Sequence, residues 1–130
     1  MAKELGIEKI VDLSYEDAIT RAKDELKKEG FGVLTEIDVK KTLQEKIGVD
    51  FEKYIILGAC NPQFAHKTLT ANKDVGLLLP CNVIVYENKE GQTVVSAVEP
   101  LQMMELIDNA EVKEIAKEVS KKLHQVINSI

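Results

Sequence analysis

The chain of 130 residues has 45% hydrophobic residues, 30% charged residues and a net charge of -5 at pH 7. This length and balance are typical of one globular domain, which we expect to span residues 1–130. The acidic net charge argues against a nucleic-acid partner, because binding to nucleic acid requires a concentrated basic surface.

The longest apolar run, residues 75–86, is broken by Pro80 and Asn82 and is too short to span a bilayer. Residues 1–6 contain no apolar signal core. We therefore expect no membrane partner and a cytoplasmic location, where thiols are normally reduced.

The first elements form a strand–helix–strand unit. Residues 7–12 place Ile7, Lys9 and Val11 on one face of an extended segment and the remaining three on the other, which predicts a half-exposed strand. Ser14 lies three residues before Asp17, as in a helix N-terminal cap, and residues 15–28 have one apolar face and predict a helix. Gly30 is expected to end that helix, and residues 31–37 predict the second strand.

The middle of the chain continues with two caps and a buried strand. Asp38 is expected to cap a short helix over residues 39–46, which Gly48 closes. Residues 54–59 are apolar on both faces, as in a strand that is covered on both sides. Asn61 is expected to cap a helix that begins at Pro62 and ends near residue 72, with Ala65 and Leu69 facing inward.

Residues 77–87 predict a strand with a break at Pro80, which cannot donate a hydrogen bond to a sheet. A loop over residues 88–91 predicts a hairpin that returns through residues 93–98. Helices are expected over residues 100–108 and 111–128. The last has an apolar stripe that suits packing on a sheet, with a self-association seam as the alternative.

These elements predict an α+β fold. We expect a twisted, mostly antiparallel five-stranded sheet that begins with a β-α-β crossover, with the helices packed mainly on one face.

Both cysteines follow an apolar run and precede an asparagine, as Cys60-Asn61 and Cys81-Asn82. A helix N-terminus favours the thiolate, the nucleophilic and metal-binding form, and Cys60 directly precedes the expected cap. The alternative is that both thiols are small core residues, a common role of free cysteine. We expect the two thiols to lie close together at one end of the sheet and to form a ligand-binding patch. Asn61 would mainly cap its helix, while Asn82 would bond at a strand edge or help to line the patch.

A second polar block ends the strand at residues 31–37. Glu36 and Asp38 lie two residues apart and can act as acid and base, or Asp38 can cap a helix while Glu36 is solvated. We include Glu36 among the candidate ligand-binding residues. His66 and His124 are both expected on solvated faces, so we expect no native four-ligand zinc site. No phosphate-binding loop or hydrolase motif is present, and no particular cofactor is indicated.

Three blocks carry a resemblance to a known family: residues 30–39 (GFGVLTEIDV), 56–62 (ILGACNP) and 76–83 (GLLLPCNV). In these blocks the chain resembles the small bacterial and archaeal proteins of the domain of unknown function family 302. The resemblance extends from the first strand through the last hairpin, and both Cys-Asn pairs belong to the family pattern. It implies a compact α/β fold and no established biochemical activity, so it assigns no catalytic residue.

Two functions are consistent with these features. The first is a non-enzymatic binding or assembly module with a two-cysteine patch. The second is a thiol-dependent redox or small-ligand-binding protein that uses Cys60 as its thiolate. We favour the first, because neither histidine falls on an apolar face where it can serve as a base to the thiols. Whether the protein is an enzyme stays open.

The sequence also predicts a homodimer. Residues 54–59 and 77–86 are apolar on both faces, whereas the predicted helices are sufficient to cover only one face of the sheet. A two-fold partner would cover the other face, because monomers rarely expose a large apolar surface.

Overall fold

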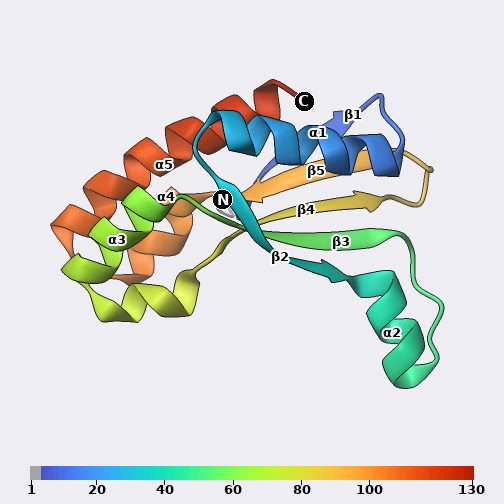
Figure 1. Ribbon diagram of the computed structural model, residues 1–130, viewed down its shortest axis with the longest axis horizontal. Coiled ribbons are helices and arrows are strands. Elements are labelled where there is room, and N and C mark those ends of the chain that lie inside the picture. Colours follow the sequence, from blue (N-terminus) through green and yellow to red (C-terminus); the bar gives the residue numbers. More distant parts are fainter. Residues whose placement is uncertain (1–3) are drawn as a thin grey trace.

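The computed structural model describes residues 4–130 and has one five-stranded sheet with the strand order β1-β5-β4-β3-β2 (Figure 1). The strands are β1 Gly6–Val11, β2 Gly32–Asp38, β3 Tyr54–Cys60, β4 Cys81–Glu87 and β5 Thr93–Val98. The helices are α1 Tyr15–Lys28, α2 Val39–Ile47, α3 Pro62–Ala71, α4 Pro100–Met103 and α5 Ala110–Asn128, with 3₁₀ helices η1 Lys73–Leu78 and η2 Met104–Leu106.

The topology confirms the predicted α+β fold. All four strand pairings are antiparallel, and β1 and β2 occupy opposite edges of the sheet. The opening β1-α1-β2 unit therefore carries the chain across the whole sheet. No helix within residues 4–130 is long and apolar enough to cross a membrane. Residues 1–3, on which the expectation about a signal segment partly rests, lie outside the described residues.

The main core lies between the sheet and the helices α1 and α5. Leu57, Val83 and Val95 point from the three central strands toward these helices and are fully buried. Leu26 of α1 and Leu123 of α5 pack against them with no exposed surface. The periodic apolar stripe of the last helix is thus used within the subunit, as the sequence indicated.

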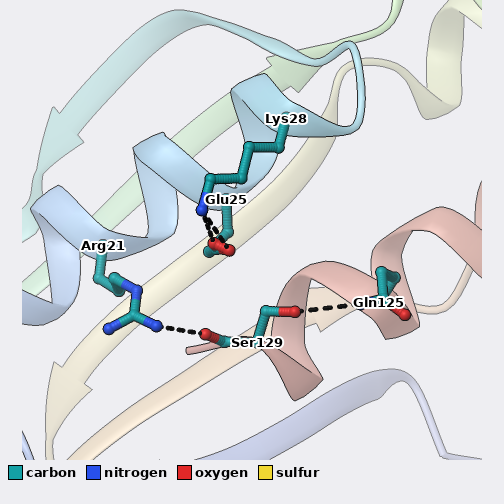
Figure 2. Close-up of polar contacts among 5 residues, drawn as sticks. All are labelled: Arg21, Glu25, Lys28, Gln125 and Ser129. Carbon is teal, nitrogen blue, oxygen red and sulfur yellow. Dashed lines mark hydrogen bonds and ion pairs between the residues drawn. The ribbon is translucent and has the colours of Figure 1, made fainter.

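Polar contacts join α1 to the end of α5 (Figure 2). The Arg21 guanidinium donates a hydrogen bond of 2.7 Å to the carbonyl oxygen of Ser129. Within α1, the ammonium group of Lys28 lies 3.0 Å from the buried carboxylate of Glu25. The Arg21–Ser129 hydrogen bond therefore links the two long helices, which lie side by side over the same face of the sheet.

The opposite face of the sheet is not packed against α1 or α5. Strand register aligns its side chains in two rows that cross the sheet. We call these rows the open face; they comprise Ile10, Val94, Tyr86 and Tyr54, then Glu8, Ser96, Ile84, Ile56 and Ile37. Ile10 and Ile37 remain 54% and 48% exposed, and Glu8 is the only charged residue in the two rows.

Two of the smaller helices lie elsewhere than the sequence indicated. If the first helix, the helix from Pro62 and the last helix are taken to cover one face of the sheet, the helix over residues 39–46 and the helix from Pro100 are left for the other. Helix α3 does not fit this expectation: it lies beyond the strand ends against α5 (Figure 1). Helix α2 was expected on the second face, but it projects past β2, away from α1 and α5 (Figure 1). It has no buried residue.

The predicted strand over residues 77–87 was wrong in its first part. The chain forms η1 up to Leu78, and β4 begins only at Cys81. In η1, Val75 and Leu78 pack three residues apart against a second apolar cluster, while Leu77 is 85% exposed. A helical period of three therefore explains the apolar residues better than a strand period of two. The predicted break at Pro80 is where the strand starts.

Candidate functional site

The two cysteines lie at the same end of the sheet, on neighbouring central strands. Cys60 is the last residue of β3, and Cys81 is the first residue of β4. Cys81 pairs in register with Ala59, the residue before Cys60. Both thiols are free. The register of this one strand pair therefore brings the backbones of the two cysteines together at one end of the sheet, as predicted.

Both cysteines line one apolar cavity of about 40 Å³ between the strand ends, α3, α4 and α5. A volume of this size exceeds what a single water molecule needs but is far below that of a nucleotide or sugar site. Apart from the thiols, no side chain that lines it within residues 4–130 is ionisable. The lining residues are Phe31, Ala59, Cys60, Asn61, Phe64, Ala65, Thr68, Leu79, Pro80, Cys81, Pro100, Met104, Ile115, Ala116 and Val119.

Asn61 is held in place by two hydrogen bonds of its side chain. Its Oδ1 accepts from the backbone N–H of Phe64 at 3.5 Å, which makes it the N-terminal cap of α3. Its Nδ2 donates to the carbonyl oxygen of Glu29 at the end of α1, at 3.4 Å. Asn61 therefore connects two helices beside Cys60 and keeps its amide from pairing with a thiol.

The environment of Cys81 disfavours its thiolate. Burial raises the pKa of the Cys81 thiol to about 11, and the negative charge of an ionised Cys60 adds to the shift. Cys81 is only 9% exposed and is protonated at neutral pH. Any nucleophilic chemistry at neutral pH would therefore begin at Cys60, which is half-buried.

Two candidate residues lie away from the cavity. The exposed Asn82 pairs in register with Gly58 and points to the opposite side of the sheet from Cys81. The carboxylate of Glu36 lies on edge strand β2 and forms an ion pair of 2.9 Å with Lys23 of α1. The structure thus brings together Cys60, Asn61 and Cys81, but not Asn82 or Glu36.

Several cavity residues were not identified from the sequence. Phe64 and Thr68 line it from α3 together with Ala65, whereas the apolar pattern pointed only to Ala65 and Leu69, the latter of which packs against the second apolar cluster. Thr68 is buried, and its hydroxyl donates to the carbonyl oxygens of Phe64 and Ala65 at 3.0 and 3.1 Å. Its four-residue spacing from Phe64 is the signal that could have revealed it. Met104 carried no such signal, because the helix expected over residues 100–108 changes to η2 at this residue.

The histidines are outside the cavity. His66 is exposed on α3, as expected. His124 is half-exposed, but its Nε2 lies 2.9 Å from the carboxylate of Glu99, which also accepts a hydrogen bond of 2.6 Å from Ser120. Burial opposes ionisation of Glu99, yet the hydrogen bonds from Ser120 and His124 outweigh it and lower its pKa. These groups join α5 to the start of α4 and do not provide a base to the thiols.

Replacing Asn61 by alanine is expected to reduce the free energy of unfolding by about 1 kcal/mol, because the change removes the cap of α3. Urea denaturation of the two proteins measures the difference. Asn61→Asp is the matched control: it keeps an oxygen that can cap the helix but loses the donor to Glu29. Equal unfolding curves for the natural protein and Asn61→Ala would show that the cap does not contribute to stability.

Together the fold and the site define a small α+β domain with two free thiols in one apolar cavity. The family described as domain of unknown function DUF302 matches residues 7–130, and the chain belongs to this family. It is similar to a solved structure, the uncharacterized conserved protein DUF302 from Bacillus stearothermophilus. The two are 34% identical with a TM-score of 0.91, over 98% of each chain. None of the curated proteins matches the chain.

Proposed function

We propose that this protein is a non-enzymatic binding module of the cytoplasm that holds a small ligand in the cavity lined by Cys60 and Cys81. The observation that carries this proposal is that both thiols line the same cavity, with Asn61 beside them. The site excludes Asn82 and Glu36, which lie elsewhere on the sheet. A reducing compartment keeps both thiols free for the ligand.

The cavity supports binding better than catalysis. Its lining within residues 4–130 includes no carboxylate, imidazole or amine that can act as a general acid or base. The side chains of Asn61 and Thr68 already have backbone partners. What the cavity provides is apolar contact and sulfur, which select a ligand without transforming it.

Thiol labelling tests this proposal. In the folded protein we expect Cys60 to react with a maleimide, and Cys81 to react at least about 100-fold more slowly because it is buried and protonated. Peptide mass spectrometry at several times measures both rates. Cys60→Ser should abolish the fast phase, and Cys81→Ser should keep it.

The same experiment separates binding from the thiol-dependent alternative. Repeating it between pH 5 and 9 gives the apparent pKa of Cys60. An apparent pKa below about 7 would favour the redox function, since Cys60 would then be a thiolate in the cell. If Cys60 does not react without denaturant, the cavity is inaccessible in the folded protein, and the proposed ligand site is wrong.

The open face favours a second role, assembly into a homodimer. A solvent-facing side of an antiparallel sheet normally carries polar residues, whereas here isoleucine and tyrosine predominate. Val94, in the same rows, is only 3% exposed. Five strands about 4.8 Å apart and six residues long give a face of roughly 500 Å² in projection, and its side-chain relief increases the accessible area. A stable interface needs about 800 Å² per partner, which the face and the adjoining α2 can provide together.

A second copy suits the open face for reasons of charge as well as area. Each chain has a net charge of -5, so two copies repel each other. A nearly neutral contact surface avoids adding to this repulsion at close range. Only Glu8 is charged within the two rows, and it lies on edge strand β1. The stacked rings of Tyr54 and Tyr86, 5.3 Å apart, provide the kind of aromatic surface that interfaces use.

A further inference from the structure

Three sulfur-bearing residues line the same small cavity: Cys60 at the end of β3, Cys81 at the start of β4, and Met104 at the start of η2. The chain has only two cysteines and three methionines, so most of its sulfur is in this one place. The three residues are far apart in sequence, and the fold brings them together. A site built of sulfur selects soft metal ions.

The donor set excludes the common hard cations and zinc. Mg²⁺ and Ca²⁺ require several oxygen ligands, and within residues 4–130 the side-chain oxygens on the cavity wall are those of Asn61 and Thr68, which are engaged with backbone groups. A structural zinc site requires four ligands, usually cysteine and histidine. Within residues 4–130, no group of three or more His, Cys, Asp or Glu side chains is placed to hold a metal.

We propose that Cys60, Cys81 and Met104 form a binding site for Cu(I). Thiolate and thioether sulfur are the ligands that select this soft monovalent ion. It needs only two or three of them, so the site is complete where a zinc site would not be. The inference rests on the cavity being the ligand site proposed above, and it names the class of ligand.

Burial and protonation set the conditions for this binding. Each cysteine binds the ion as a thiolate, so one Cu(I) that takes both thiols releases two protons and gives a complex with a net charge of -1. Because a cysteine must lose its proton to bind the ion, protons compete with Cu(I) for both sulfurs. Half-buried Cys60 provides the point of entry, while Cys81 and Met104, both at least nine-tenths buried, shield the ion from oxidants.

The test is an anaerobic titration of the reduced protein with Cu(I) in competition with a chromophoric Cu(I) chelator. We expect one ion per chain, and about two protons released per ion in weakly buffered solution. Cys60→Ser and Cys81→Ser should each weaken binding by more than about 100-fold, since loss of a ligand costs more than loss of an outer-shell contact. Cys81→Ala repeats the second test without a buried hydroxyl, and circular dichroism checks that each variant is folded.

Two methionine substitutions provide a matched test and control. Met104→Leu removes the third sulfur at nearly constant volume and should weaken binding by about 10-fold. Met103→Leu makes the same change at the neighbouring residue, which does not line the cavity, and should leave the affinity unchanged. Equal effects of the two substitutions would show that Met104 is not a ligand of the ion.

Two outcomes would overturn the proposal: no competition with the chelator by the natural protein, or undiminished affinity in both folded cysteine variants. Either result leaves the binding module intact if Cys60 still reacts with maleimide in the folded protein. If Cys60 is unreactive as well, the cavity itself is inaccessible and the broader proposal fails with the narrower one.

Discussion

Replacing Ile84 by aspartate is expected to convert the homodimer proposed above into monomers at micromolar concentration. Ile84 lies on central strand β4, where register places it in the middle of the open face between Ser96 and Ile56. In the isolated chain this side chain is partly exposed, so the substitution should leave the fold intact. In the dimer it would bury an unpaired carboxylate from each subunit, at a cost of about 3 kcal/mol or more.

Light scattering and sedimentation measure the result directly. The natural protein should have twice the 14.5 kDa mass of the chain, and the variant should have the mass of one chain. Leu77→Asp is the matched control, because Leu77 is 85% exposed on η1 and lies outside the open face. A natural protein that is monomeric at micromolar concentration, or a dimer unaffected by Ile84→Asp, would show that the open face is not the interface.

Strong local signals explain why most of the fold could be predicted from the sequence. Ser14, Asp38 and Asn61 each accept a hydrogen bond from a backbone N–H three residues later, as expected of N-terminal caps. Gly48 ends α2 with a φ of 68°, a conformation that favours glycine. Caps and glycines act within a few residues, so their effect does not depend on the rest of the fold.

Long-range packing could not be predicted in the same way. The apolar run around Leu77 fits a strand or a helix equally well by composition, and the choice depends on a second cluster formed with Val112 and Met104. Whether a helix lies on the sheet or beyond its ends likewise depends on tertiary contacts. The placement of α3 and α2 was therefore wrong, although their boundaries were nearly right.

The residues of the candidate site likewise divide into those that local sequence signals predict and those that depend on long-range packing. The repeated Cys-Asn pattern located Cys60 and Cys81, and the strand register then placed them at one cavity. The pattern also pointed to Asn82, which alternation along β4 directs to the opposite side of the sheet from Cys81. Met104 was missed because nothing in its local sequence distinguishes it from Met103. Only the packing of η2 against α5 does so.

Replacing Gly58 by valine is expected to reduce the free energy of unfolding by about 3 kcal/mol and to expose Cys81. A side chain at Gly58 would overlap Oγ1 of Thr35, and its Cβ would lie 2.9 Å from Cγ of Pro80. The proline ring is rigid and immediately precedes Cys81, so relief of the contact must displace the start of β4. The absence of a side chain at Gly58 thus leaves room for the proline ring, which lines the cavity beside Cys81.

Gly32→Val is the matched control for this experiment. Gly32 also lies in a strand, but a Cβ added there would meet no atom within 4 Å, and valine favours a strand conformation. We expect its unfolding curve, measured in urea at the same protein concentration, to match or exceed that of the natural protein. Maleimide labelling of Cys81 should be faster in Gly58→Val than in Gly32→Val, because only the first substitution moves Pro80. Equal stability and equal Cys81 labelling in the two variants would mean that the contact between Gly58 and Pro80 does not hold the cavity closed.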